Sequence, residues 1–151
     1  MVRRIHTGWF VLVVPLVLFV YFVRYLPLDS QSAPIPISVT WIEALDLHFS
    51  VYLDGLALMF ALIITGIGVL VVLYSIYYMD KLREALHNFY VYLLLFMGAM
   101  LGIVLSDHTL IMYIFWEATS VSSFLLIAYW YERQGSRYGA QKSLLITVLG
   151  G

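Results

Sequence analysis

Residues 56 to 79 read LALMFALIITGIGVLVVLYSIYYM, a run of 24 positions without one charged side chain. An α-helix needs about 20 predominantly apolar residues to cross the ~30 Å hydrocarbon core of a bilayer. This stretch is long enough to do so, and we expect it to be a transmembrane helix. The rest of the chain divides by the same criterion.

Four further stretches have this apolar character and are bounded by charged or turn-forming residues. The last one begins near Tyr138 and has 14 residues up to Gly151, about 21 Å of helix and too short to cross. We therefore expect an all-α fold, a polytopic transmembrane helix bundle with four full helices and a truncated fifth, as part of a larger protein. The whole chain, residues 1 to 151, forms a single transmembrane region with helices at about 9 to 28, 56 to 79, 89 to 106, 109 to 131 and, incomplete, 138 to 151.

Composition supports a bilayer as the solvent. The chain is 63% hydrophobic and 11% charged, with a mean hydropathy of +0.94, whereas soluble domains are roughly half apolar and a quarter charged. Eight Lys/Arg and nine Asp/Glu are too few to cover a globule of this size with a polar shell. The net charge of -1 also leaves no basic surface for nucleic acid, which we exclude as a partner.

Cofactor chemistry has no support in the sequence. The absence of cysteine excludes disulfides, Fe–S ligation and thiolate catalysis. The four histidines are dispersed without metal-ligand spacing, and no phosphate-binding or dinucleotide motif occurs. We expect no cofactor and no enzymatic site within this chain.

The basic residues predict an orientation. If the helices alternate in direction, seven of the eight Lys and Arg fall on one side, and only Arg24 falls on the other. The positive-inside rule places the seven in the cytoplasm. The segment of residues 29 to 49, which contains Pro34 and Pro36, is then expected to be a polar extracytoplasmic loop. A cleaved signal peptide is a weaker alternative for the N-terminus, because the apolar stretch from Trp9 is rather long for one.

Glu117 is the most informative residue for function. It lies eight positions into the fourth predicted helix, about 12 Å below the outer surface and close to mid-bilayer. An ionised group there costs about 2.5 to 3.5 kcal/mol on translocon scales, and such groups mark proton relays and ion pathways. The alternative is a structural role, in which a protonated or paired glutamate ties helices together. Tyr113 and Ser120 share its helical face and would give the carboxylate a polar lane.

Lys142 is the second candidate. It lies about one turn into the fifth predicted helix, and a lysine at that depth can also extend to the interface and play no other role. Counted from the cytoplasmic ends, it is offset from Glu117 by roughly 14 Å, so we expect no direct salt bridge. Water or another side chain must connect the two groups if they communicate.

Two weaker signals have structural explanations. Asp54, before Gly55, is adequately explained as an N-cap of the second predicted helix. Gly98 and Gly102 form a G-x-x-x-G pattern, which here favours a contact within the bundle over a dimer motif.

Four blocks of sequence resemble a known family. They are VYLDGLALMFALIITGIG at residues 51 to 68, FMGAMLGIVLSD at 96 to 107, FWEATS at 115 to 120 and SRYGAQKSLLIT at 136 to 147. In this order and spacing they resemble the A subunit of Mrp-type multisubunit Na⁺/H⁺ antiporters, which is related to the antiporter-like subunits of respiratory complex I. The resemblance covers family helices two to five and part of six.

The resemblance implies roles for particular residues. The essential mid-membrane glutamate of the superfamily falls on Glu117, and the lysine of the following helix falls on Lys142. It also implies a multi-pass protein of a bacterial plasma membrane, with other antiporter subunits, the lipid bilayer, protons and a monovalent cation such as Na⁺ as partners. His108 departs from the family, since asparagine is expected there.

Three functions remain open from the sequence. The resemblance favours a proton-translocating component of an antiporter. The first alternative is a proton-pumping component of a complex I-like oxidoreductase or membrane hydrogenase, whose redox cofactors lie on other chains. The second alternative is a membrane scaffold or fragment without transport. Periodicity and spacing do not separate these functions.

Overall fold

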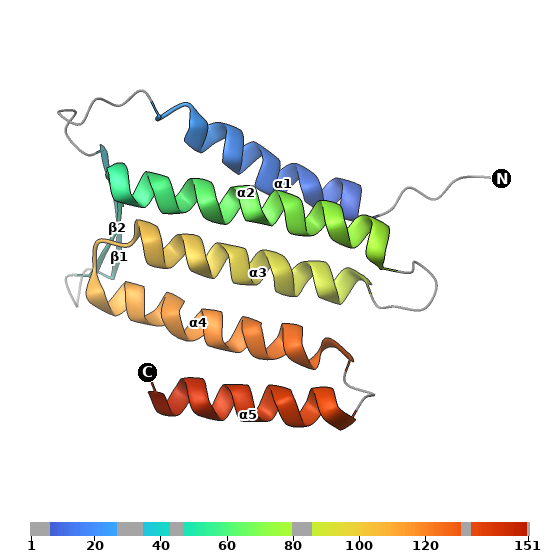
Figure 1. Cartoon of the computed structure of the whole chain (residues 1–151). Coiled ribbons are helices and arrows are strands. Elements are labelled where there is room, and N and C mark those ends of the chain that lie inside the picture. Colours follow the sequence, from blue (N-terminus) through green and yellow to red (C-terminus); the bar gives the residue numbers. More distant parts are fainter. Residues whose placement is uncertain (1–6, 27–34, 43–46, 80–85, 131–133, 151) are drawn as a thin grey trace.

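The computed structural model describes residues 7–26, 35–42, 47–79, 86–130 and 134–150. Five helices follow one another in alternating directions, so that each packs against the next along the chain (Figure 1). This confirms the predicted helix bundle. The elements are α1 (Thr7–Val23), β1 (Ile35–Ile42), β2 (Leu47–Leu53), α2 (Gly55–Tyr78), α3 (Leu86–Leu105), α4 (Thr109–Ile127), the 3₁₀ helix η2 (Ala128–Trp130) and α5 (Gln134–Gly150).

Three of the described helices are long and apolar enough to cross a membrane: α2 with 24 residues, α3 with 20 and α4 with 19. Helix α1 is apolar but has 17 residues. Backbone bonds from Arg24, Tyr25 and Leu26 to the carbonyls three positions earlier extend it by one turn, giving a length of about 30 Å. The chain is a multi-pass membrane protein, and its many exposed large apolar side chains face lipid or other protein segments.

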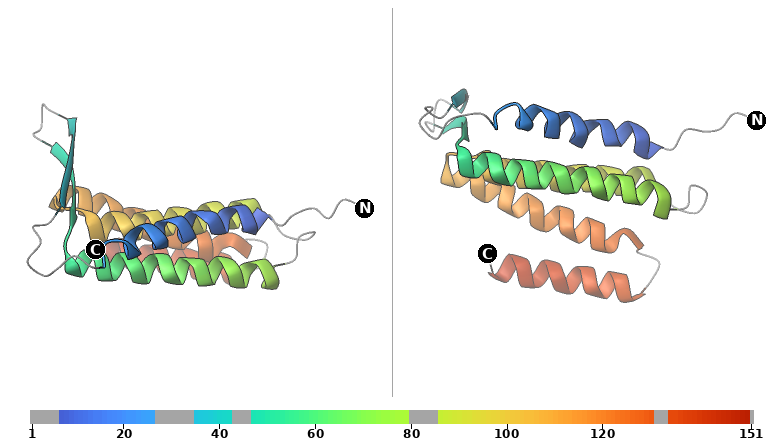
Figure 2. Two further views of the ribbon diagram at one scale, coloured as in Figure 1. Left: turned by 90° about the horizontal axis from the view of Figure 1, so that it is seen from above. Right: turned by 45° about the horizontal axis from the view of Figure 1, so that its top comes forward.

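The segment between α1 and α2 contains a β-hairpin, and the expectation of a loop throughout residues 29 to 49 was wrong there. Strands β1 and β2 pair antiparallel in a register that sets Ile35 opposite Leu53, with one irregularity between Thr40 and Ile42. In the sequence IPISVTWI of β1, the apolar β-branched or aromatic residues at positions 35, 37, 39 and 41 alternate with Pro, Ser and Thr, a pattern that favours a strand. The hairpin stands at a steep angle to the helix axes at one end of the bundle (Figure 2).

Two clusters of buried side chains hold α1, α2 and α3 together. At the hairpin end, Phe22 of α1 and Leu101 of α3 pack around Leu58 and Ala61 of α2. At the other end, Val72 of α2 packs with Tyr90 of α3. Between the clusters, α1 crosses α2 at Gly68, where an added Cβ would lie 2.8 Å from Met97 Sδ and 3.5 Å from Pro15 Cβ. A glycine permits this close approach of three helices.

Helices α3 and α4 are packed through Gly102. A side chain at this position would overlap the ring of Phe115 on α4, whereas a Cβ at Gly98 would meet nothing within 4 Å. Only Gly102 of the G-x-x-x-G pair therefore makes the contact within the bundle that the sequence predicted.

Candidate functional site

Glu117 lies near the middle of α4. The helix begins at Thr109 because His108 caps it: its Nδ1 accepts a hydrogen bond from the Leu110 N–H at 3.2 Å. Eight residues then separate Thr109 from Glu117, about 12 Å along the axis, and ten more lead to Ile127, about 15 Å. Glu117 is the only Asp, Glu, Lys or Arg in the whole of α2, α3 and α4.

The faces of α4 show which neighbour lies beside this carboxyl group. Phe115, against Gly102, and the fully buried Ser122 mark the side toward α3. Ser120 is also buried, about 200° around the helix from Ser122, and α5 is the other helix that packs on α4. Ser120 therefore marks the side toward α5. Glu117 is about 60° from Ser120, so it flanks the contact between α4 and α5.

The Glu117 side chain is half-buried and, among the described residues, has no hydrogen-bond or ion-pair partner. The hydroxyls of its neighbours bond to their own helix instead. Thr119 donates to the Trp116 carbonyl at 2.6 Å, and Ser120 approaches the same carbonyl at 3.5 Å. Tyr113 is 52% exposed on the same face. The polar side chains expected on this face thus lie near the carboxylate without a hydrogen bond to it.

The structure places Lys142 deeper than the sequence indicated. Helix α5 begins at Gln134, four residues before the expected start at Tyr138, so Lys142 lies eight residues, about 12 Å, into the helix. Glu117 lies about 21 Å from the end of η2, counting ~15 Å of α-helix and ~6 Å of 3₁₀ helix. If the end of η2 and the start of α5 lie at the same level, the axial offset between Glu117 and Lys142 falls from the expected ~14 Å to about 9 Å.

Lys142 also points away from Glu117. Ala140 is fully buried and marks the face of α5 that packs on α4. Two residues further, Lys142 lies about 200° around the helix and is exposed. The structure therefore does not bring the two candidate residues together.

The hairpin end of the bundle holds two carboxylates that sequence reasoning did not bring together. Asp54 caps α2 as predicted, accepting a hydrogen bond from the Ala57 N–H at 2.7 Å. Asp107 lies in the turn between α3 and α4. Both line one cavity of about 310 Å³, together with Ser106 and Phe60. No signal in the sequence pairs residues 54 and 107, because the packing of α2 on α3 brings them to one place.

The described part of the chain contains no candidate metal site. Across those ranges, no three His, Cys, Asp or Glu side chains come together as potential ligands. His108 is used as a helix cap. Its position directly before Thr109 is the sequence signal that could have revealed this role.

Comparison with known proteins assigns a family. Residues 38–90 match the family described as NADH-ubiquinone oxidoreductase (complex I), chain 5 N-terminus, and residues 106–151 match the NADH:quinone oxidoreductase/Mrp antiporter transmembrane family. The chain is 61% identical over 149 residues to the A-type subunit of the Na⁺/H⁺ antiporter of Alkalihalophilus pseudofirmus. This chain belongs to the Mrp antiporter and complex I family of antiporter-like subunits.

Two further comparisons concern antiporter proteins, and a third concerns the fold alone. The A1-type subunit of a Na⁺/H⁺ antiporter from Staphylococcus aureus is 58% identical over 149 residues. The Mrp complex from Dietzia has a chain with 30% identity and a TM-score of 0.79, matched over 95% of this chain and 15% of that one. A chain of the archaeal membrane-bound sulfane sulfur reductase shares the fold, with a TM-score of 0.71 at 18% identity over 98% of this chain and 22% of its own length. The matches to the two curated antiporter subunits include 99% of this chain and 18% of each relative. This chain therefore spans about a fifth of their length.

Proposed function

We propose that this chain belongs to a proton-translocating subunit of a multisubunit Na⁺/H⁺ antiporter in the cell membrane, with Glu117 as the proton carrier. The observation that carries the proposal is the isolation of this carboxyl group. It is the only Asp, Glu, Lys or Arg in three consecutive membrane-spanning helices, it is half-buried, and it has no bonded partner among the described residues. A structural glutamate that ties helices together would need a partner.

The chemistry follows from the cost of charge inside a membrane. The neutral carboxylic acid is favoured in apolar surroundings, and the carboxylate is favoured when water or a cation approaches. Glu117 can therefore take a proton from one side and release it to the other as hydration of the α4–α5 side changes. Tyr113 and Ser120 provide polar groups along this path.

Lys142 contributes from a distance in this proposal. It lies about 12 Å into α5, faces away from α4 and is exposed, so its charge needs water or another protein segment beside it. It then affects the protonation of Glu117 through intervening water or side chains.

The partners follow from the relatives. Those that match this chain are subunits of antiporters and of an Mrp complex by their names. We infer that this chain assembles with other subunits of such a complex and acts as a transporter, without a redox site of its own. A complex I-like oxidoreductase is the second candidate, because residues 38–90 match a family named for complex I.

Glu117→Gln tests the proposal. The amide keeps the volume of the side chain and cannot exchange a proton. In everted vesicles carrying the complete protein within its complex, we expect Na⁺-dependent proton flux, followed by acridine orange fluorescence, to be abolished with assembly intact. Glu117→Asp, which keeps the titratable group with a shorter reach, should retain part of the flux.

Val121→Gln is the matched control. Val121 is one turn further along α4 on the same flank and is 48% exposed, so this variant adds an equal amide without removing the carboxyl group. It should transport normally. Normal flux in an assembled Glu117→Gln complex would refute the proposal and make Glu117 a structural residue.

A further inference from the structure

Thr147 of α5 lies at the level of Glu117 on α4. The end of η2 and the start of α5 are at the same end of the bundle (Figure 1). Thr147 is thirteen residues into α5, about 20 Å, and Glu117 is about 21 Å from the end of η2. Beyond Ser143, Thr147 is the only polar side chain of α5. This helix therefore offers one hydroxyl group at the depth of the carboxyl group.

Thr147 also faces α4. It is seven residues after Ala140, about 20° short of two full turns, and Ala140 marks the face of α5 that packs on α4. Ala140 is fully buried whereas Thr147 is exposed, because the two helices separate toward the hairpin end (Figures 1 and 2). Tyr113, on the α5 side of α4, is exposed at the same end. Polar side chains from both helices thus border the space beside Glu117.

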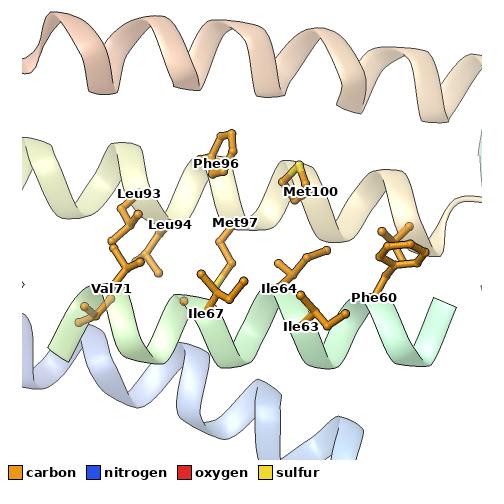
Figure 3. A pocket seen from close by; sticks show the side chains of 13 residues that line it. Phe60, Ile63, Ile64, Ile67, Val71, Leu93, Leu94, Phe96, Met97 and Met100 are labelled. Carbon is orange, nitrogen blue, oxygen red and sulfur yellow. The ribbon is translucent and has the colours of Figure 1, made fainter. Parts of the chain in front are cut away.

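The space between α2 and α3 has the opposite character. A cavity of about 520 Å³ there is lined by apolar side chains, among them Ile63, Ile67 and Met97 (Figure 3). A buried water molecule needs two to four polar partners. No side chain that lines this cavity provides one, whereas those beside Glu117 do. We therefore expect water to approach Glu117 from the α5 side.

The hydrogen of the Thr147 hydroxyl group is already used within α5. Thr147 Oγ1 donates it to the Ser143 carbonyl at 2.8 Å. The lone pairs of Oγ1 remain, so this hydroxyl can accept a hydrogen bond but cannot pass on a proton while its own bond is kept. A water molecule that donates to Thr147 keeps its second hydrogen and its lone pairs for Glu117. It can bond to the carboxylic acid as well as to the carboxylate.

Ser120 provides a third partner for such a water molecule. It is buried on the α5 side of α4, and its Oγ is 3.5 Å from the Trp116 carbonyl, at the outer limit of a hydrogen bond. We propose that Thr147 is a positioning residue that, together with Ser120, holds one water molecule against the Glu117 carboxyl group. The inference deepens the proposed function, and it rests on that function for its effect on proton flux.

Infrared difference spectroscopy of the complete, assembled complex tests the inference. Spectra between low and high pH contain the C=O stretch of each carboxyl group that changes its protonation, and the band of Glu117 is the one lost in Glu117→Gln. Thr147→Val keeps the shape of the side chain and removes the acceptor. We expect the Glu117 band to move to higher frequency, because the carboxyl group loses a hydrogen-bond partner.

Two further readouts follow the same variant. A water O–H band, recognised by its shift in water enriched in heavy oxygen, should disappear in Thr147→Val. The initial rate of Na⁺-dependent proton flux in everted vesicles should fall roughly fivefold to tenfold, the factor that one lost hydrogen bond accounts for.

Two other variants control for the substitution. Thr147→Ser keeps a hydroxyl that can bond to the Ser143 carbonyl, and it should restore both the Glu117 band and the flux. Thr65→Val makes the same change on α2, where Thr65 donates to the carbonyl of Ala61, one turn earlier, at 2.7 Å. Helix α2 packs on α1 and α3. This variant should leave the Glu117 band and the flux unchanged.

Three results would overturn the inference. They are an unchanged Glu117 band in the assembled Thr147→Val complex, an equal shift in Thr65→Val, and a Thr147→Ser spectrum like that of Thr147→Val. Should Thr147→Val fail to assemble, Thr147→Ala lacks the same hydroxyl and takes its place.

The two proposals fail separately. Normal flux in Glu117→Gln would remove the transport role of Glu117 and leave the spectra to decide the position of the water. An unchanged band in Thr147→Val would remove the bound water and leave Glu117 as the proton carrier.

Discussion

Glu117 and Lys142 differ in how far the described helices surround their side chains. The helix that carries Glu117 is flanked by α3 and α5 in the structure, so the surroundings of the carboxyl group are largely defined. Lys142 faces away from α4, and no described helix packs on α5 from that side. Glu117 therefore lies beside a contact between helices of this bundle, whereas the surroundings of Lys142 depend on whatever adjoins its outer face.

We predict that Lys142→Ala reduces proton flux by less than Glu117→Gln. Glu117 keeps its own carboxyl group in this variant and can still exchange a proton. Lys142 is offset from Glu117 by about 9 Å along the helix axes and faces away from it, which leaves room for water between the two groups. Initial rates of Na⁺-dependent proton flux in everted vesicles measure the difference.

Lys142→Arg provides the control, because it keeps the charge at the same place and should transport better than Lys142→Ala. A complete loss of flux in an assembled Lys142→Ala complex, equal to that of Glu117→Gln, would show that the lysine is itself an obligatory carrier.

The sequence singles out Glu117 and Lys142, but it does not predict that Lys142 faces away from α4. The depth of Glu117 follows from the turn at Asp107 and His108, which fixes the start of α4. The depth of Lys142 was underestimated because Gln134, Gly135 and Ser136 are typical of a turn and a cap, yet they form the first turn of α5. Gly135 and Ser136 have a weaker helix propensity than most residues, and the structure nevertheless includes them in the helix.

At the scale of elements, long apolar stretches identify the helices because a membrane imposes length and apolarity locally. The hairpin could not be read in the same way. Its pairing joins residues as far apart as Ile35 and Leu53, and Pro34 and Pro36 in the intervening segment are typical of loops.

We predict that Gly102→Ala destabilises the packing of α3 on α4. The new methyl group overlaps the Phe115 ring, and overpacking of this kind costs about 1–3 kcal/mol. Thermal unfolding of the assembled complex in mild detergent, followed by size-exclusion chromatography, should show a lower midpoint temperature.

Gly98→Ala is the matched control on the same helix, since a Cβ there meets nothing within 4 Å. Phe115→Leu combined with Gly102→Ala should recover part of the loss by making room. Equal midpoints for the two alanine variants would contradict the contact between Gly102 and Phe115.

At the scale of the whole molecule, the arrangement divides the chain between two ends. The hairpin, Asp54 and Asp107 lie at one end, and the end of α2, the start of α3, η2 and the start of α5 lie at the other (Figure 1). Lys81, Arg83 and Arg133 belong to those connections in the sequence. The positive-inside rule then assigns the hairpin end to the outside.

We predict that cysteines introduced singly at Ser32 and Gln134 label differently in intact cells. The chain has no native cysteine, so each variant carries one reactive thiol. A membrane-impermeant maleimide should modify Ser32→Cys and leave Gln134→Cys unmodified until the membrane is permeabilised. The reverse pattern would invert the assigned topology.

The position of Lys142 inside α5 has a consequence for biosynthesis. A lysine within a membrane-spanning helix raises the free energy of its insertion, by about 2.5 to 3.5 kcal/mol where it lies at the helix centre, and Arg137 and Gln141 add polar groups to the same helix. Helices α2 and α3 contain no Asp, Glu, Lys or Arg and can leave the translocon for the lipid by themselves. We expect α5 to remain at the translocon until its Ala140 face has docked on α4, so that the order of synthesis becomes the order of assembly.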